Sequence, residues 1–548
     1  MSITAQGVPE TIPAADALLT DLMRRPWGQV SPSVYETGRL VTLAPWLVGH
    51  EERLAFLVAT QRPDGSWGAP DGYGLVPTLS ATEAILSALL RDGHGAPGAD
   101  RHRLESEDGD RHGLEGAERH GLEGADRYSL GEADRHRLEE AARRGLRALA
   151  DCLGARRELP DMPAIEHIVP SLVALINQHV QALPGQPPLP LPDDMSYDTL
   201  ALIRSWIAAG TEVPEKLLHA LEIAGPAASG APAVAPTAIG TVGASPAATA
   251  AWLGERGWRD ADDPARGHLE ALARRHGGPV PVGVPITVFE RGWVLSWLIR
   301  AGVPIDVPPE MVADLRAAIG PAGTPAGPGL PADADTTSVA LYALSLLGAP
   351  YEPDSLWAFH SGTHFSTWPG EQGSSVSVNA HVLDAFGQYV ARRPAAADRY
   401  GAAITGTAEW IRDRQRPDGS WDDRWHASPY YATASCALAL DEFGGEESAA
   451  AVRAAADWVL DGQRADGSWG RWEGTAEETA YAMMTLLLTG PRGSDPRRAE
   501  AAARGHAHLV RSAGADHPPL WHDKDLYTPV AVVRAAVLAS SYLAQQAC

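Results

Sequence analysis

The chain has 548 residues and a formal net charge of −24, with 69 acidic and 45 basic side chains. This length exceeds what one hydrophobic core normally serves, so we expect two domains. The acidic balance argues against nucleic acid or an anionic membrane surface as the main partner. Three scattered cysteines and the lack of a basic, apolar leader predict a cytoplasmic protein without disulfides. No apolar stretch reaches the length of a membrane span.

Residues 110–141 consist of four octads that read DRHGLEGA, ERHGLEGA, DRYSLGEA and DRHRLEEA. Each octad holds one leucine among charged and small residues, which cannot build a core. We therefore expect an exposed insertion, disordered or loosely helical, from about residue 94 to 141. Packed structure should resume near Glu139. The histidines at octad spacing are better explained by a solvated surface than by metal binding.

Elsewhere apolar residues recur at helical spacing, and alternating strand patterns are nearly absent. In chain order, the predicted helices cover residues 81–90, 170–180, 196–210, 291–302, 336–348, 376–391, 432–440, 450–463, 477–490 and 530–545. Several of these segments end in glycine, as helix C-termini do. The fold class is therefore all-α, and the Gly/Pro-rich residues 277–285 mark the expected domain junction.

A short motif occurs three times after predicted helices, as QRPDGSWG from Gln61, QRPDGSWD from Gln415 and QRADGSWG from Gln463. Asp-Gly favours a turn, and the glutamine amide can cap carbonyl groups at the end of the preceding helix while the tryptophan covers that end. We interpret these repeats as structural staples between outer helices of an α-barrel. They explain part of the excess of 17 Trp over 6 Phe.

A second motif, Asp333-Ala334-Asp335-Thr336-Thr337, precedes the predicted helix at 336–348. One interpretation is a helix N-cap, in which Asp or Thr accepts from free backbone N–H groups. The other is a general acid, because repulsion between neighbouring carboxylates and burial both raise a carboxyl pKa. The helix N-terminus opposes this effect, since it favours the anion.

The Gln-to-Trp repeat and the D-x-D-T-T motif together resemble class II diterpene cyclases, which are built from two α-barrels. Further blocks of the family match residues 165–172, 213–222, 241–253, 284–298, 423–433 and 520–533. The resemblance implies a γ barrel over about 25–283 and a β barrel over 284–548, with residues 1–24 packed on the latter and the substrate between the two. It also implies proton-initiated cyclisation of geranylgeranyl diphosphate to a bicyclic diphosphate of the copalyl type, in the ent series, without loss of the diphosphate.

By this resemblance Asp335 is the general acid, and Asp333 and Thr336 orient and reprotonate it. His219 matches the family's terminal base, but the asparagine that accompanies it would fall near Val282, where this sequence has none. A carbocation needs shielding and π-faces, and the candidates for the cavity wall are Trp293, Trp297, Trp368, Asn379, His381, Tyr430, Tyr431 and Tyr527.

The retained diphosphate needs cations, for which Lys524 and Arg291 are candidates, and the family often uses Mg²⁺. The nearest counterparts of its acidic metal motif are Glu158, Asp161 and Glu166. The segment DDMSYD at 193–198 has the wrong spacing for ionising the diphosphate and is better explained as a helix start. The product would then pass to a separate class I diterpene synthase.

Three alternatives stay open at this point. Another class II product, such as halimadienyl diphosphate, would use the same acid. An α-barrel glycoside hydrolase would use Asp333 and Asp335 as its carboxylate pair, although residues two apart rarely straddle one glycosidic bond. A prenyl-binding, prenyltransferase-like protein would need a zinc site, for which Cys436 offers no convincing ligand pattern.

Overall fold

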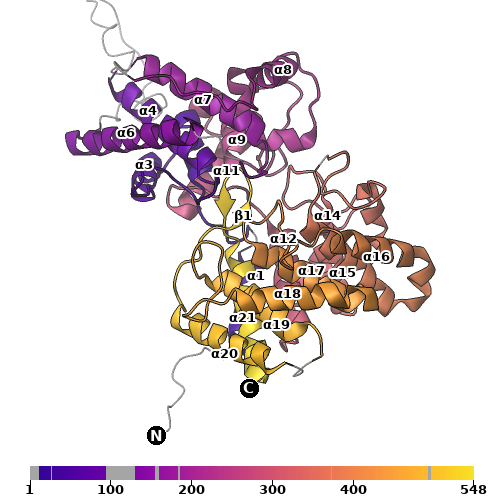
Figure 1. The fold of residues 1–548 in the computed structure, drawn as a ribbon. Coiled ribbons are helices and arrows are strands. Elements are labelled where there is room, and N and C mark those ends of the chain that lie inside the picture. Colours follow the sequence, from indigo (N-terminus) through magenta and orange to yellow (C-terminus); the bar gives the residue numbers. More distant parts are fainter. Residues whose placement is uncertain are drawn as a thin grey trace, which may run out of the picture. The chain divides into compact units, whose positions relative to one another are not determined.

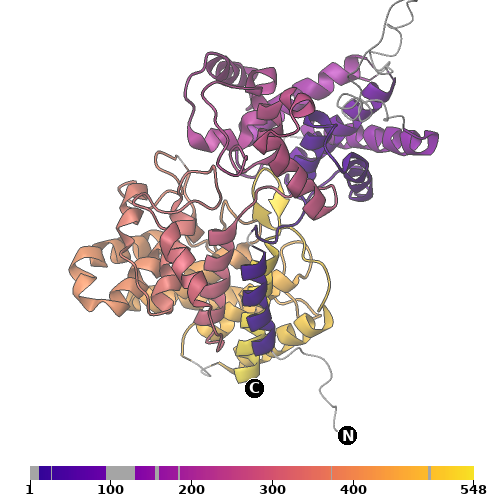
Figure 2. The same cartoon turned by 180° about the vertical axis from the view of Figure 1, so that it is seen from behind.

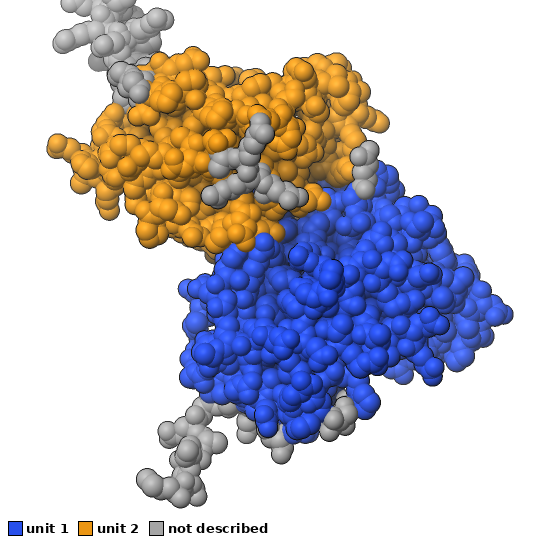
Figure 3. All heavy atoms as spheres, viewed as in Figure 1, with its two compact units in different colours: residues 1–31, 283–548 blue, residues 32–282 orange. Residues whose placement is uncertain are grey.

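The computed structural model describes residues 11–25, 27–93, 130–154, 159–182, 186–371, 373–491 and 495–547. The chain divides into two compact units (Figure 3). Unit 1 comprises residues 1–31 and 283–548, and unit 2 comprises residues 32–282. The described residues are mostly helical, which confirms the all-α class.

Unit 1 is an α/α-barrel with a closed inner ring of helices. Each inner helix packs on the next, and the last packs on the first. In ring order they are α12 (Thr287–Arg300), α14 (Ala334–Leu346), α15 (Val376–Arg392), α17 (Pro429–Phe443), α19 (Ala476–Leu488) and α21 (Val530–Ala547) (Figure 1). Because an inner helix is covered on both sides, it is buried around most of its circumference, as α14 is from Ala334 to Ser345.

An outer layer of helices covers this ring and comes from the connections between inner helices. Its members are α13 (Pro309–Ala318), η2 (Pro353–Phe359), η3 (Pro394–Ala396), α16 (Ala397–Arg412), η4 (Glu446–Ser448), α18 (Ala449–Asp461) and α20 (Pro496–Arg511). The N-terminal helix α1 (Thr11–Arg24) completes the layer by packing on α12 and α21 (Figure 2). A short antiparallel pair, β1 (Trp521–His522) and β2 (Leu526–Tyr527), precedes α21.

Unit 2 has a less regular ring of the same kind. Its inner members are α2 (Val34–Leu43), α4 (Leu75–Gly93), α7 (Ile165–Gln181), η1 (Glu215–Ala228) and α9 (Pro246–Leu253), each in contact with the next and α9 with α2. The η1 segment is a 3₁₀ stretch kinked at Ala220 and Gly225. The outer members are α3 (His50–Ala59), α6 (Glu132–Gly154), α8 (Tyr197–Ala208), α10 (Arg256–Arg259) and α11 (Pro264–His276).

The three Gln-to-Trp motifs join neighbouring outer helices, but the tryptophan rather than the glutamine caps the preceding helix. The indole of Trp469 donates to the carbonyl of Val459 in the preceding helix, 2.6 Å away. The amide of Gln463 instead donates 2.8 Å to Ala501 in the following outer helix, α20. The tryptophan therefore caps the preceding helix and the glutamine holds the next one. The carbonyl of Val459, which lies in the last turn of α18, is thereby paired.

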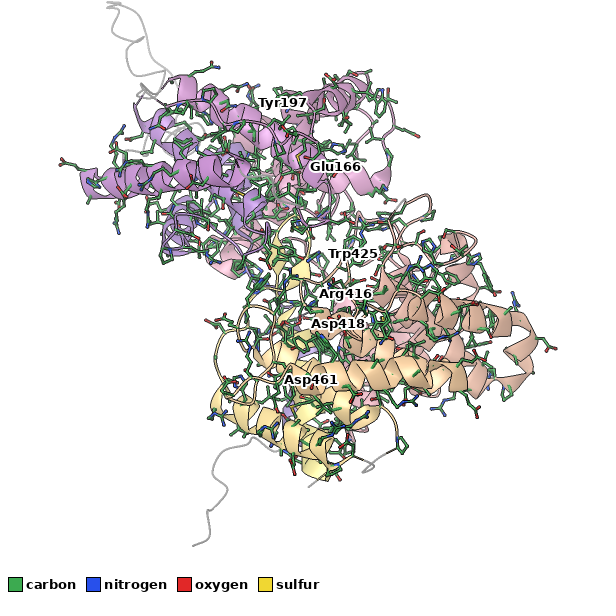
Figure 4. All side chains as sticks on the ribbon, viewed as in Figure 1. Glu166, Tyr197, Arg416, Asp418, Trp425 and Asp461 are labelled. Atoms are coloured by element: carbon green, nitrogen blue, oxygen red, sulfur yellow. The ribbon has the colours of Figure 1, made fainter. Side chains whose placement is uncertain are left out.

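The other two copies repeat this geometry. Trp421 donates 2.9 Å to Ile411 of α16, and Gln415 donates 2.8 Å to Ala451 of α18. In unit 2 the corresponding bonds join Trp67 to α3 and Gln61 to α6. Arg416 and Asp418 belong to the turn of the middle copy (Figure 4). The interpretation of these motifs as structural staples agrees with these bonds.

Two local expectations can be compared with the structure. Residues 193–198 lead into α8, whose N-cap Ser196 accepts from the backbone N–H of Asp198, so the helix start is confirmed. Helix α6 begins at Glu132 within the last octad, but its first buried residue is Leu138, so packed structure resumes near Glu139 as expected. The earlier octads lie largely in residues 94–129, outside the described residues. No described helix has the length and apolarity needed to span a bilayer.

Candidate active site

The D-x-D-T-T motif forms the N-terminus of α14, an inner helix of unit 1. Asp333 is the N-cap, and its Oδ1 accepts from the backbone N–H of Thr336 at 2.6 Å. Asp335 lies in the first turn, and both carboxyls are buried, with exposed fractions of 5% and 9%. The two interpretations of the motif therefore apply to different residues: Asp333 performs the capping, and this leaves the Asp335 carboxyl for other contacts.

The environment of Asp333 favours its neutral form. Burial raises the pKa of this carboxyl, the bond from Thr336 lowers it, and the neighbouring Asp335 raises it again, to about 7. Burial thus outweighs the hydrogen bond from Thr336. Near neutral pH this site can exchange a proton, which suits a residue expected to reprotonate Asp335.

Asp335 is paired with a histidine on the adjacent inner helix. His381 Nδ1 of α15 lies 2.6 Å from Asp335 Oδ1, and both side chains are largely buried. Burial alone lowers the pKa of His381, but the charge of Asp335 and its hydrogen bond outweigh burial and raise it. The structure therefore places a readily protonated imidazole directly beside the expected acid. The sequence suggested His381 only as a polar member of the cavity wall.

Aromatic rings surround this pair. Trp293 of α12 lies edge-on to His381 with ring centroids 5.4 Å apart, and its indole N–H donates to the Tyr431 hydroxyl at 3.0 Å. Tyr431 of α17 packs on Trp521 with centroids 4.8 Å apart, and Phe289 stacks on Trp293 at 4.3 Å. Two of these residues, Trp293 and Tyr431, were expected from the sequence. Phe289 and Trp521 were missed, although Phe289 lies one helical turn before Trp293.

A buried glutamate anchors the far side of the aromatic cluster. Glu477 of α19 is fully buried, and its Oε1 accepts from the Trp521 indole at 2.7 Å and from the Tyr481 hydroxyl at 3.1 Å. His426 Nε2 lies 3.2 Å from the same oxygen. These bonds fix the ring planes, because a buried carboxylate needs donors with good geometry. No sequence motif distinguished Glu477 from the other helix-forming glutamates.

Several expected wall residues lie elsewhere in unit 1. Tyr430 packs on Trp458 of the outer helix α18, with centroids 4.6 Å apart, whereas its neighbour Tyr431 faces the acid. Asn379 is committed to backbone groups, since its amide exchanges two bonds with Phe365 and donates a third to Ser375. We therefore assign Asn379 a structural role.

Trp297 and Trp368 occupy different surroundings. Trp297 is buried in the inner ring beside Tyr481, with centroids 5.7 Å apart. Trp368 lies edge-on to Trp425 at 5.3 Å, in the loops before α15 and α17. Trp425, which is labelled in Figure 4, donates to Thr367 at 3.1 Å. The loop that carries Trp368 also contacts the acid motif, since the backbone N–H of Ala334 donates to the carbonyl of Thr367.

The expected contacts of the diphosphate differ in their accessibility. Lys524 is fully buried, so its ammonium group is not presented to solvent. Arg291 is also buried and forms an ion pair with Asp314 at 2.8 Å, which engages its charge on the outer side of the barrel. Burial, and then the charges of Asp523 and Asp335 among others, raise the hydroxyl pKa of Tyr527 well above 10.

His219 belongs to η1 of unit 2. Its Nδ1 lies 2.6 Å from the carbonyl oxygen of Gly243, which can only accept, so Nδ1 carries the hydrogen. In the neutral ring Nε2 is then unprotonated and can act as a base. Val282, where the family's asparagine would stand, is a buried apolar residue.

The expected metal ligands do not form a metal site among the described residues. Glu158 lies outside them. Glu166 is in the first turn of α7 (Figure 4), where it is exposed and pairs with His167 at 3.3 Å. Asp161 has partners but belongs to no cluster of three or more potential ligands, and the described residues contain no such cluster. The Mg²⁺ ligands expected from the sequence, which include Glu158, stay a prediction.

The fold and the site agree with the similarity to known proteins. A family model described as the C-terminal domain of squalene-hopene cyclases matches residues 372–535. The ent-copalyl diphosphate synthase of Streptomyces sp. (strain KO-3988) is 42% identical over 96% of this chain and 95% of that protein. The copalyl diphosphate synthase of Streptomyces cyslabdanicus is 39% identical over 99% and 97%.

Solved structures give the same result. The ent-copalyl diphosphate synthase of Streptomyces platensis has a TM-score of 0.86 and 44% identity, and the match covers 98% of this chain and 100% of that one. The Arabidopsis thaliana enzyme of the same name shares the fold, with a TM-score of 0.54 at 15% identity over 98% of this chain and 63% of that chain. The resemblance inferred from the motifs is thereby confirmed, and the glycosidase and prenyltransferase-like alternatives fall away. The chain is a member of the bacterial class II diterpene cyclases, the family that contains these copalyl diphosphate synthases.

Proposed function

We propose that this protein protonates geranylgeranyl diphosphate at its terminal alkene and cyclises it to a bicyclic copalyl-type diphosphate, with the diphosphate retained. The observation that carries this proposal is the Asp335–His381 contact of 2.6 Å, buried among aromatic rings. A carboxylic acid that must protonate an alkene needs a dry site and a partner for the anion that it leaves behind. Asp335 has both.

In the proposed first step, Asp335 transfers its proton to the alkene, whose π electrons form the new C–H bond. The carboxylate that results is stabilised by the protonated ring of His381, which donates from Nδ1 to Oδ1. Because Oδ1 is engaged by His381, Oδ2 is the oxygen from which the proposed transfer takes place. Because an adjacent positive charge stabilises the anion, it strengthens Asp335 as an acid. Asp333 and Thr336 hold the start of α14 in place.

The carbocation then migrates along the chain as successive alkenes attack it and close two rings. The faces of Trp293, Tyr431 and Trp521 are the nearest π-systems to the acid pair, and cation–π contact lowers the energy of such intermediates. Their rings are fixed by hydrogen bonds from Trp293 to Tyr431 and from Trp521 to Glu477. A rigid wall selects one folded conformation of the substrate over others.

The reaction ends by loss of a proton, for which we propose His219 as the acceptor. Its Nδ1 hydrogen is directed to Gly243 O, so in this proposal Nε2 is the atom that takes the proton. Because Val282 replaces the asparagine expected beside it, the base acts without that partner. If this assignment holds, His219→Ala should lower turnover and increase the share of alcohols formed by water capture of the cation.

We further propose ent-copalyl diphosphate as the product, because both the relative from strain KO-3988 and the solved enzyme from S. platensis carry that name. The second candidate is a labdane relative with another alkene position, since a labda-7,13-dienyl diphosphate synthase of Streptomyces clavuligerus is 39% identical over 97% of this chain. A product that retains its diphosphate suits a class I diterpene synthase as the next enzyme. The proposed steps use no metal ion.

The test is incubation with geranylgeranyl diphosphate, with and without Mg²⁺, followed by phosphatase treatment and chiral chromatography with mass spectrometry. A bicyclic alcohol of the ent series is the expected result. Asp335→Asn should abolish its formation, whereas Asp398→Asn should not, because Asp398 is an exposed aspartate in the first turn of the outer helix α16. An olefin released without phosphatase, or an active Asp335→Asn variant, would contradict the proposal.

A further inference from the structure

A small cavity lies inside the inner ring of unit 1, behind the acid pair. It is lined by side chains of three adjacent inner helices, among them Ser296 and Trp297 of α12, Tyr342 of α14 and His381 of α15. Tyr342 follows Asp335 by seven residues, about two helical turns, so its Cα lies about 10 Å further along α14 than that of the acid. About 20 Å³ is open to the centre of a water molecule, which is room for roughly one water.

Three polar atoms of the cavity wall have no hydrogen-bond partner among the described residues. They are Ser296 Oγ, Trp297 Nε1 and the Tyr342 hydroxyl, on side chains that are at least nine-tenths buried. Three such atoms around one cavity are unusual, since buried polar groups are normally paired with protein or with ordered water. The cavity is therefore polar and large enough to hold a water with several partners.

The floor of the cavity is an ion pair that reaches toward the surface. Arg300 contacts Asp384 through two bonds, at 2.7 and 3.0 Å, and also contacts Glu442 at 3.0 Å. Asp384 is buried, whereas the Glu442 side chain is 41% exposed. The charge of the guanidinium group is thus balanced by these carboxylates.

We propose that this cavity binds one ordered water molecule, which accepts a hydrogen bond from His381 Nε2 and so keeps the His381 ring protonated beside Asp335. This inference rests on the proposed roles of Asp335 and His381 and adds Ser296, Trp297 and Tyr342 as positioning residues. It accounts for why three buried polar groups converge on the rear of the histidine.

The donors and acceptors balance for a single water. Its two lone pairs accept from Trp297 Nε1, which can only donate, and from His381 Nε2. Its two hydrogens go to Ser296 Oγ and to the Tyr342 oxygen. His381 Nδ1 is already used by Asp335, so Nε2 is the ring atom that remains for the water. With both N–H groups bonded, the charged ring is favoured over the neutral one.

The carboxylates around the His381 ring also favour its protonated form. The titratable and charged groups that face it are Asp335 and Tyr342 of α14, Arg300 of α12, Asp384 of α15, Tyr431 of α17 and Asp423 of the preceding loop. The carboxylates raise the pKa of His381 against the effect of burial. Burial raises the pKa of Tyr342 well above 10, so its hydroxyl is neutral and can serve the water.

The test compares Ser296→Ala and Tyr342→Phe with Ser345→Ala, in the full chain. Ser345 is a matched control, because its hydroxyl is also buried and unpaired among the described residues but lies outside the cavity lining. Weakening the water should move the alkaline limb of the kcat/KM profile down by about 0.5 to 1 pH unit. The loss would be about 3- to 10-fold at alkaline pH and absent at acidic pH. Ser345→Ala should keep the wild-type profile.

A direct readout separates this inference from the proposed function. A high-resolution crystal structure should show a water peak about 3 Å from both Trp297 Nε1 and His381 Nε2. A dry cavity, or unchanged pH profiles in both cavity variants, would overturn the water site even if Asp335→Asn is inactive. An active Asp335→Asn variant would instead overturn the acid assignment, whatever the cavity holds.

Discussion

Replacing His381 by phenylalanine tests the central contact of the site. The ring volume and the edge contact with Trp293 are preserved, while the 2.6 Å bond to Asp335 is lost. A hydrogen bond to a charged group contributes about 1.5–3 kcal/mol. If that energy stabilises the carboxylate that forms as the proton leaves, kcat should fall about 10- to 150-fold. KM should change little, because His381 contacts the acid rather than the substrate in this scheme.

The assay is single-turnover formation of the bicyclic product, quantified by mass spectrometry after phosphatase treatment, with circular dichroism to verify folding. His381→Gln keeps one uncharged donor and should lose less activity than His381→Phe. The wild-type rate should fall as pH rises through the raised pKa of His381, and His381→Phe should lack that limb. A folded His381→Phe variant with wild-type kcat across the pH range would refute the pairing as a catalytic device.

Three further predictions concern stability. Asp333→Asn keeps the cap but removes a carboxyl whose pKa rises from 3.8 to about 7 on burial. Because the folded state holds this proton more tightly than the unfolded state, the wild type loses stability as the pH rises from about 4 to 7. The Tm of the variant relative to the wild type should therefore be higher at pH 8 than at pH 5. Trp469→Phe removes the hydrogen bond that caps α18 and should lower the free energy of unfolding by about 1–3 kcal/mol in a urea titration. Trp258→Phe is the control, because Trp258 is 50% exposed and its replacement should change this free energy little. Gly467→Ala places a Cβ 2.6 Å from a backbone oxygen at φ +90°, whereas the Cβ of Gly514→Ala meets nothing within 4 Å at φ +84°. Both variants strain the backbone, but only the first adds a steric clash, so Tm should fall further for Gly467→Ala. Equal falls would show that backbone strain alone accounts for both.

The acid pair shows how the family's chemistry is distributed over the barrel. Asp335 and His381 are on neighbouring inner helices, and the rings of Trp293 and Tyr431 come from the helices on either side. The closed ring places all of these side chains on its inner face. The two helices that hold the acid and its histidine also line the small cavity behind them, together with α12. The outer staples are remote from this chemistry and stabilise the scaffold.

The sequence by itself determined the features that depend on contiguous residues. Helical spacing of apolar residues indicated the inner helices, and the Gln-to-Trp motif indicated the staples. The D-x-D-T-T motif indicated both a cap and an acid, because an N-cap bond joins residues three apart, as it does from Thr336 to Asp333. Family blocks in the right order indicated the cyclase.

Only the tertiary structure decided how distant residues are partnered. Asp335 and His381 are 46 positions apart, and Glu477 and Trp521 are 44 apart, so their bonds depend on which inner helices become neighbours when the ring closes. Asn379 is bonded to backbone groups and Lys524 is buried, although residue type alone suggested ligand contacts for both. Polar side chains choose partners by distance and burial in three dimensions, and no local pattern along the chain encodes that choice.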